Sequence, residues 1–429
     1  MKKAERSSPR PADTSVPVVV LARSPSPLLH GVLGVVRSLG RWGVPVYAAG
    51  AGGTMPADYS RYLQDRFELS FDEGVRGRYL DDLLDVGRQI GRRSILLPID
   101  EPSTMFLADN DSALEECFEF PRQDRDLVHA LANKRHLYEL CQRWGVPTPH
   151  TLFPQDLSDV RTFCRHGHFP VVVKAIDPRV VHEDAQGKSV MIARTAEELL
   201  ELFERQPDKG APNLLLQEYI PGGSDSIWMF NGYFDDRSDC LLSFTGVKLR
   251  QCLPDTGPTS LGLCRHNETV DRSTRDFLKA LGYRGIVDLG YRYDARDGRY
   301  KMLDVNPRIG STFRLFVGHN GMDVARAAYL DLTGQPVPAS SAPDGRKWFV
   351  EQYDLLSSVM LGRQRRLGLR SWVRSLRGID EAAWFARDDL APFPAMVRCC
   401  ARLAWDKVAA VATGIEAGAR SAAEGPARG

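Results

Sequence analysis

The stretch from Tyr283 to Arg308 reads YRGIVDLGYRYDARDGRYKMLDVNPR and contains the most specific chemical pattern in the chain. Two alternating runs of apolar and polar residues flank Asp297-Gly298, a pair that predicts a tight turn between antiparallel strands. Asp304 and Asn306 are two residues apart, so they project from one face of the second strand. Their oxygen atoms suit Mg²⁺, which takes waters and phosphates as its other ligands. Asp288 in the first strand could supply another carboxylate across the hairpin.

Three upstream features suit a nucleotide. Lys174 ends the apolar strand FPVVVKA and would present a cation to a phosphate, although a solvated strand-end lysine is the plain alternative. The stretch LLLQEYIPGG is a buried strand and a linker whose backbone groups can pair with an adenine edge, and an interdomain hinge is compatible with this. Lys248 and Arg250 in FTGVKLRQ are expected to share one strand face. Two cations there suit a triphosphate or an acyl phosphate, while a polar sheet surface is the alternative.

The order of apolar runs predicts a mixed α/β and α+β protein. VPVVVLA, a helical stretch and VPVYAA form a β-α-β start, and SILLPID adds a third strand. We therefore expect a flexible tail at 1–14, a Rossmann-like domain at 15–120, a small α+β unit at 121–212 and a larger one at 213–335. Residues 336–429 are expected to be a linker and an arginine-rich helical region.

Composition narrows the class of protein. The 429 residues include 56 Lys and Arg against 55 Asp and Glu, so no sequence-wide charge favours nucleic acid or an anionic membrane. The eight cysteines have no CxxC spacing, which disfavours a zinc site or a disulfide framework and fits a reducing cytoplasm. No apolar run approaches the roughly 18 to 20 residues that span a bilayer. Small-molecule substrates are therefore expected.

Several stretches, in this order, resemble the ATP-grasp superfamily: NKRHLYELCQRWGVPTP, FPVVVKA, QEYIPGGSDS, FTGVKLRQ and the hairpin quoted above. The resemblance is greatest to carboxylate–amine ligases related to carbamoyl-phosphate synthase large subunits and to D-aspartate ligases. It covers about residues 15–335. It implies a Rossmann-like pre-ATP-grasp domain followed by a two-part ATP-grasp fold that holds ATP and Mg²⁺, or Mn²⁺, between its parts.

The resemblance also implies site residues. They are Lys134 and Lys174 at the phosphates, Gln217, Glu218, Tyr219 and Ile220 at adenine, Asp225 at ribose, Lys248 at the γ-phosphate, Asp304 and Asn306 at the metal, and Arg308 at an acyl phosphate. Two positions depart from the family pattern. Gly290 stands where a second metal carboxylate is usual, with Asp288 two residues earlier, and the phosphate loop DPRVVHEDAQGKS has a single glycine.

These features predict an ATP-dependent ligase that forms C–N bonds. A substrate carboxylate would attack the γ-phosphate, and an amine would open the resulting acyl phosphate, with Mg²⁺, Lys248, Arg250 and Arg308 neutralising charge. The partners would be small-molecule carboxylates and amines, and homo-oligomerisation is left open. The two departures favour an alternative, a nucleotide-binding sensor or assembly protein with a degenerate site. A nicotinamide-dependent oxidoreductase is disfavoured because the GAGG at 50–53 lacks the GxGxxG order.

Overall fold

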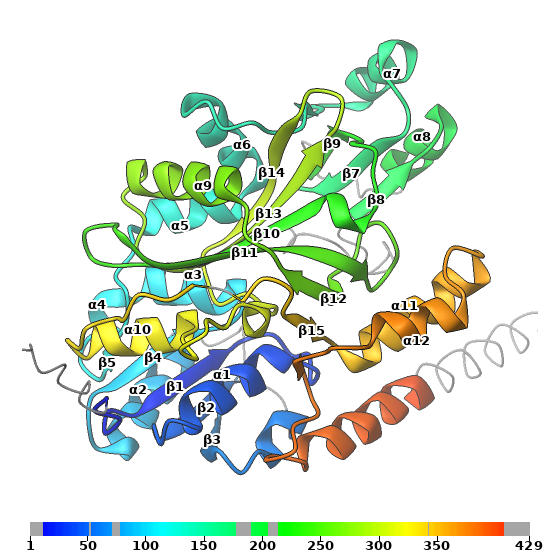
Figure 1. The fold of residues 1–429 in the computed structure, drawn as a ribbon. Helices are drawn as coiled ribbons and strands as arrows, with labels where there is room; N and C mark the ends of the chain where they lie inside the picture. The colour runs from blue at the N-terminus through cyan, green and yellow to red at the C-terminus, as the bar shows by residue number, and fades with distance from the viewer. Residues whose placement is uncertain are drawn as a thin grey trace, which may run out of the picture.

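Three β-sheets organise the chain in this computed structural model, which describes residues 12–50, 53–70, 78–176, 190–204, 213–341 and 343–406. Figure 1 shows the N-terminal sheet at the bottom, the largest sheet in the middle and the smallest sheet at the top. The mixed α/β and α+β class predicted from the sequence is confirmed.

The N-terminal unit is a parallel five-stranded sheet of order β3-β2-β1-β4-β5 with helices on both faces. Its elements are β1 (Val18–Ala22), α1 (His30–Gly40), β2 (Val46–Gly50), η1 (Pro56–Tyr59), β3 (Leu63–Glu68), α2 (Arg78–Ile90), β4 (Ser94–Pro98), α3 (Glu101–Asp109), α4 (Asp111–Leu114) and β5 (Phe118–Glu119). The Asp100 side chain caps α3 by accepting a hydrogen bond from the Ser103 N–H. This arrangement agrees with the predicted Rossmann-like domain.

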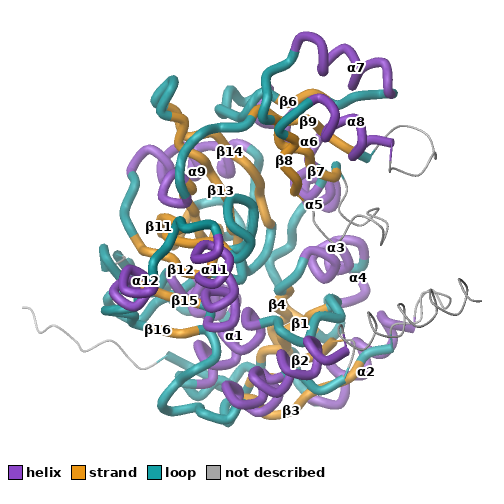
Figure 2. Tube along the Cα trace, turned by 90° about the vertical axis from the view of Figure 1, so that its right-hand side faces the viewer, coloured by secondary structure: helices purple, strands orange, loops and turns teal. Residues whose placement is uncertain are grey.

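The small unit contains a four-stranded sheet of order β6-β9-β7-β8. Its elements, with the two helices that precede it, are α5 (Arg125–Ala132), α6 (Lys134–Arg143), β6 (Thr151–Leu152), α7 (Leu157–His166), β7 (Val171–Ala175), β8 (Val190–Ala193), α8 (Ala196–Glu204) and β9 (Leu214–Glu218). One face of the sheet packs on α7 and α8. Figure 2 shows this sheet and its helices at the end of the molecule opposite the N-terminal unit.

The large sheet has seven strands in the order β14-β13-β10-β11-β12-β15-β16. Its elements and neighbours are η4 (Ser224–Ser226), β10 (Ile227–Phe234), β11 (Cys240–Gln251), β12 (Thr259–Cys264), α9 (Glu268–Ala280), β13 (Gly285–Asp294), β14 (Arg299–Asn306), η5 (Phe313–Leu315), α10 (Val324–Leu332), β15 (Lys347–Phe349), α11 (Glu351–Arg363), α12 (Leu369–Ser375), β16 (Glu381–Ala382) and helical residues 392–406. Strands β13 and β14 form the predicted hairpin around the Asp297-Gly298 turn.

The sheets divide the chain differently from two of the predicted boundaries. Strand β9 lies after residue 213 but pairs with β6 and β7, so it belongs to the small sheet. Strands β15 and β16 lie beyond residue 335 but extend the large sheet. Both differences arise because strand pairing is non-local, whereas the boundaries came from local patterns.

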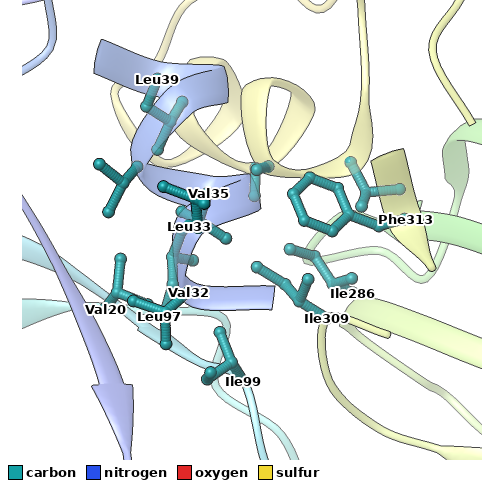
Figure 3. Close-up of a cluster of buried hydrophobic side chains, with 14 of the residues drawn as sticks. Val20, Val32, Leu33, Val35, Leu39, Leu97, Ile99, Ile286, Ile309 and Phe313 are labelled. Carbon is teal, nitrogen blue, oxygen red and sulfur yellow. The ribbon is translucent and has the colours of Figure 1, made fainter. Parts of the chain in front are cut away.

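One hydrophobic core joins the N-terminal unit to the large sheet. Side chains of α1 lie between those of β1 and β4 and residues of the large unit, including Ile286, Ile309 and Phe313 (Figure 3). The opposite face of the large sheet packs on α5, α6 and α9. Within the described ranges, no helix has the length and apolar content needed to cross a bilayer. The shared core therefore fixes the N-terminal unit against the strands that carry Asp288 and Asp304.

Candidate nucleotide site

A cavity of about 440 Å³ lies between the small sheet and the large sheet. This volume falls within the range of roughly 300 to 1,000 Å³ that small-molecule sites usually have. Strands β7, β8 and β9 supply one wall, and β11, β13, β14 and residues 255–258 supply the other. The predicted site residues that line it are Lys134, Lys174, Gln217, Glu218, Tyr219, Ile220, Lys248 and Asp304.

Strand alternation directs Lys174 into this cavity. Val171 and Val173 of β7 pack in the core with α7 and α8, so Lys174 faces the other side of the sheet. The residue is only 8% exposed, and among the described residues it has no ion-pair partner. Burial and, to a smaller extent, repulsion from Lys134 lower the pKa of Lys174 to about 8, with Asp304 partly opposing the shift. A buried cation without a carboxylate partner suits an anionic ligand.

The linker after β9 is tied to the large sheet through Glu218. Its carboxylate accepts hydrogen bonds from Lys301 Nζ at 2.9 Å, from Arg296 at 3.1 Å and from the His150 N–H at 3.1 Å. Burial alone would raise the pKa of Glu218, but these bonds outweigh burial and lower it. Glu218 thus ties the end of β9 to the large sheet while also lining the cavity. Ile220 is buried beside it.

The register of β13 and β14 defines the candidate metal ligands. Gly290 lies opposite Asp304, and Asp288 lies opposite Asn306. A side chain at Gly290 would collide with Asp304 Oδ1, so the Asp304 carboxylate fills the space above this glycine. The Asn306 amide nitrogen lies 3.5 Å from Asp304 Oδ2, so their side chains are neighbours.

Asp304 and Asn306 fit Mg²⁺ by the chemistry of their oxygen atoms, provided that phosphates and waters complete the shell. The described part of the chain contains no group of three His, Cys, Asp or Glu side chains that could hold a metal without such help. A metal bound here would therefore depend on the nucleotide.

Asp288 projects from the same face of β13 as Gly290, but it is not among the residues that line the cavity. Its neighbours Val287 and Leu289 pack in the opposite core, and its Oδ1 atom is buried without a hydrogen-bond partner. Burial raises the pKa of Asp288 to about 7, with nearby Asp304 adding to the shift and Arg308 opposing it. Its predicted role as a substitute metal ligand stays a prediction.

Lys248 and Arg250 do not share a strand face, and the prediction that they do is wrong. Lys248 pairs with Gly262 and Arg250 with Leu261, so the strand bulges between them and the alternation is lost. Lys248 faces the cavity, where burial lowers its pKa while Asp304 and Asp288 act in the opposite direction.

The Arg250 guanidinium instead reaches the C-terminal helices. It donates to both Asp354 carboxylate oxygens, at 2.8 and 3.1 Å, and to Ser375 Oγ at 2.8 Å. Asp354 is 1% exposed and also accepts a hydrogen bond from Trp372 Nε1. Arg250 therefore joins β11 to α11 and α12, and its predicted charge-neutralising role is not supported by this placement.

Asp225, Asn306 and Arg308 also lie outside the cavity lining. Asp225 is an exposed residue of η4 whose charge acts on Arg292. Arg308 donates to Asn306 Oδ1 at 3.3 Å, next to the candidate metal ligands. It also lines a separate cavity of about 60 Å³ between the N-terminal unit and the large sheet.

Sequence reasoning missed five polar residues that line the cavity: Glu101, Gln251, Asp255, Thr256 and Arg292. Arg292 follows Gly290 on the same strand face, a position that alternation could have revealed. Asp255 lies in the loop between β11 and β12, where Leu253 and Asp255 adopt φ values of 63° and 76°. Arg366 holds this aspartate with two bonds of 2.8 and 2.9 Å. The PDTGP sequence signals a turn but not its contact with the connection between α11 and α12, more than 100 residues away.

Comparisons with known proteins agree with this geometry, although no protein-family model matches the chain. The chain is 26% identical over 325 residues to a D-aspartate ligase of Enterococcus faecium (strain Aus0004), covering 70% of this chain and 75% of that protein. It is 22% identical over 216 residues to the carbamoyl phosphate synthase large chain of Thermus thermophilus. That match covers 48% of this chain and 20% of the synthase.

Solved structures share the fold. An L-amino acid ligase from Bacillus licheniformis superposes with a TM-score of 0.54 at 15% identity, over 75% of each chain. The ADP complex of an N5-carboxyaminoimidazole ribonucleotide synthetase gives a TM-score of 0.58 at 10% identity, over 78% of this chain and 80% of that one. The chain is therefore similar in sequence to two ATP-dependent ligases and shares the fold of the ATP-grasp carboxylate–amine ligases among the solved structures.

Proposed function

We propose that this enzyme activates a carboxylate as an acyl phosphate and transfers the acyl group to an amine. A carboxylate oxygen would attack the γ-phosphorus of ATP, and the bond to the β,γ-bridging oxygen would break, releasing ADP. The neutral amine would then attack the acyl carbon, phosphate would leave with the C–O bond electrons, and the amine would lose a proton to complete the amide.

The arrangement of charge around the cavity carries this proposal. Lys134 and Lys174 approach from the small-unit side and Lys248 from the large sheet. Three cations around one cavity suit the charge of a triphosphate, and phosphoryl transfer depends mainly on such positioning and neutralisation. The linker residues 217–220 enter the same cavity and would present backbone groups to adenine, with Asp225 beyond them for the ribose.

Asp304 and Asn306 would hold Mg²⁺, which supplies Lewis-acid stabilisation of the phosphate oxygens when bound. Asp288 is the candidate for a further carboxylate on the same strand face. Arg308, beside Asn306, would contact the acyl phosphate. In this assignment Lys248 neutralises the transferred phosphoryl group without help from Arg250.

Phosphate release from ATP, screened over carboxylic acids with and without amines, tests the proposal. D-aspartate belongs in the screen because a D-aspartate ligase is among the relatives. Release should require both an acid and an amine, and hydroxylamine should trap the activated acid as a hydroxamate. Lys248→Met should abolish release, whereas Lys279→Met should not, because Lys279 pairs with Asp239 on the exposed surface of the large unit. Release that proceeds equally without any acid would contradict the proposal.

A nucleotide-binding sensor with a degenerate site is the second candidate, and Gly290 is the observation that favours it. The phosphate loop at 177–189, the other departure noted in the sequence, lies outside the described residues. A sensor would bind ATP with Mg²⁺ but release no phosphate with any acid and amine pair.

A further inference from the structure

Large apolar side chains lie exposed on α11 and α12. Five large hydrophobic side chains are exposed there: Leu355 by 56%, Leu356 by 48%, Val359 by 46%, Leu369 by 72% and Val373 by 51%. In α11, Leu355, Leu356 and Val359 lie on the side of the helix opposite the buried Asp354 and Ser357. Large apolar side chains left exposed on two neighbouring helices favour an interaction surface.

Positive charge surrounds these side chains. Residues 355–378 contain no Asp, Glu or Lys, and they contain six arginines: Arg363, Arg365, Arg366, Arg370, Arg374 and Arg377. Arg366 pairs with Asp255, and in the part of the chain that the structure describes the other five form no ion pair. We call residues 350–378 the basic hairpin. Its charge contrasts with the near-zero net charge of the whole chain.

Buried contacts hold the apolar side outward. Asp354 accepts hydrogen bonds from Arg250 at 2.8 Å and from Trp372 at 2.8 Å, so it fixes α11 to β11 and to α12. Ser357 is fully buried and donates to the Gln251 carbonyl at 2.7 Å. Figures 1 and 2 both show α11 and α12 side by side, and in Figure 1 they lie at the right-hand edge of the molecule. Rotation of α11 to hide its leucines would break these bonds, so the exposure is built into the fold.

We propose that the basic hairpin binds the surface of a membrane that contains anionic lipids. The leucine and valine side chains would enter the headgroup and acyl boundary, and the arginines would contact the lipid phosphates. This combination of apolar and basic residues is typical of interfacial helices.

Two other partners fit the surface less well. A second copy joined through the same face would bring the two sets of arginines together without acidic residues of residues 355–378 to balance them. Nucleic acid favours exposed aromatic rings for base stacking, whereas the exposed apolar residues here are aliphatic and Trp372 is bonded to Asp354.

Co-sedimentation of the full chain with vesicles tests the proposal. We expect binding to phosphatidylcholine vesicles that contain phosphatidylserine, weak binding to phosphatidylcholine alone, and release by salt. The double variant R370A/R374A should bind the anionic vesicles roughly thirtyfold more weakly, because each basic residue near such a surface contributes about fivefold. L356S/L369S should also weaken binding although it changes no charge.

The matched control is R161A/R272A, which removes two exposed arginines from α7 and α9. Vesicle binding by the control should equal that of the parent chain, and binding of an ATP analogue should be unchanged in all these variants. Equal loss of vesicle binding in the control, or no binding to anionic vesicles, would overturn the proposal. Two other results would overturn the proposal if the chain does not bind vesicles. One is a dimer that L356S/L369S converts to a monomer, and the other is nucleic-acid binding that R370A/R374A abolishes.

Discussion

Lys174→Met should stabilise the fold and weaken ATP binding at the same time. In the free protein, Lys174 is a buried cation that no carboxylate of the described chain pairs with, so its charge opposes folding. Methionine keeps most of the side-chain volume and removes the charge. The same charge would contact ATP phosphates, so its removal should weaken ATP binding. A variant that is more stable but binds ATP more weakly would show that Lys174 serves ligand binding and destabilises the free protein.

The expected stabilisation follows from the pKa of Lys174. Its fall from 10.5 to about 8 corresponds to roughly 3 kcal/mol. Between these two pH values the unfolded chain binds more protons than the folded chain, so stability rises with pH through this window. The full cost is present below pH 8, and a measurement at neutral pH detects it. Loss of a charge-assisted phosphate contact, worth about 1.5 to 3 kcal/mol, should raise the dissociation constant for ATP roughly tenfold to hundredfold.

Urea unfolding and calorimetric titration with a non-hydrolysable ATP analogue and Mg²⁺ measure the two effects. Lys301→Met is the matched control, because Lys301 is 9% exposed but lies 2.9, 2.8 and 3.2 Å from Glu218, Asp294 and Asp297. Burial would lower the pKa of Lys301, yet these partners outweigh it and raise the pKa. The control should therefore lose stability, by about 3 kcal/mol or more. A destabilised Lys174→Met variant, or an analogue affinity within about twofold of the parent, would refute the reasoning.

Three further predictions concern other parts of the cavity. Asp304→Asn should abolish Mg²⁺-dependent turnover with an unchanged melting temperature, and a normal magnesium titration would contradict its role. Between pH 3.8 and about 7 the folded chain keeps the Asp288 proton that the unfolded chain loses, so Asp288 should make the free energy of unfolding fall as pH rises. In Asp288→Asn this pH dependence should be absent from urea unfolding curves measured across that range. Arg366→Glu should weaken binding of the ATP analogue about two- to fivefold by repelling Asp255, and adding Asp255→Arg should restore that binding. If calorimetry shows no restoration, the Arg366–Asp255 pair does not support the cavity wall.

Local sequence patterns predicted which way a side chain faces where that depends on the alternation of a single strand. Lys174 and Asp304 face the cavity because period-two alternation holds through β7 and through the end of β14. The linker 217–220 was predicted for a similar reason, since an apolar strand followed by Pro-Gly-Gly marks where the chain leaves a sheet. In each case a few neighbouring residues determine the outcome.

The sequence-based predictions that failed concern contacts between segments far apart in the chain. Arg250 changed face because β11 bulges after Lys248, and its buried partner Asp354 lies 104 residues further along the chain. Strand β9 joined the small sheet because its pairing partners are β6 and β7. Arg366 supports Asp255 across 111 residues. No periodicity within one element encodes such pairings, so a single sequence read by local pattern could not reveal them.

Asp304 fills the space above Gly290, and this bears on how the proposed metal site could work without the second carboxylate that the family resemblance implies at position 290. Because a side chain at Gly290 would collide with Asp304 Oδ1, the present position of the Asp304 carboxylate requires glycine there. An acidic residue restored at 290 would therefore displace Asp304 instead of adding a ligand beside it. The second carboxylate on this strand face belongs to Asp288, which lies opposite Asn306. Its charge acts to raise the pKa of Lys248. A bound divalent cation would favour the ionised form of Asp288, whereas burial disfavours it in the free protein. Metal and nucleotide should consequently bind together, since each supplies charge that the other needs in this buried cavity.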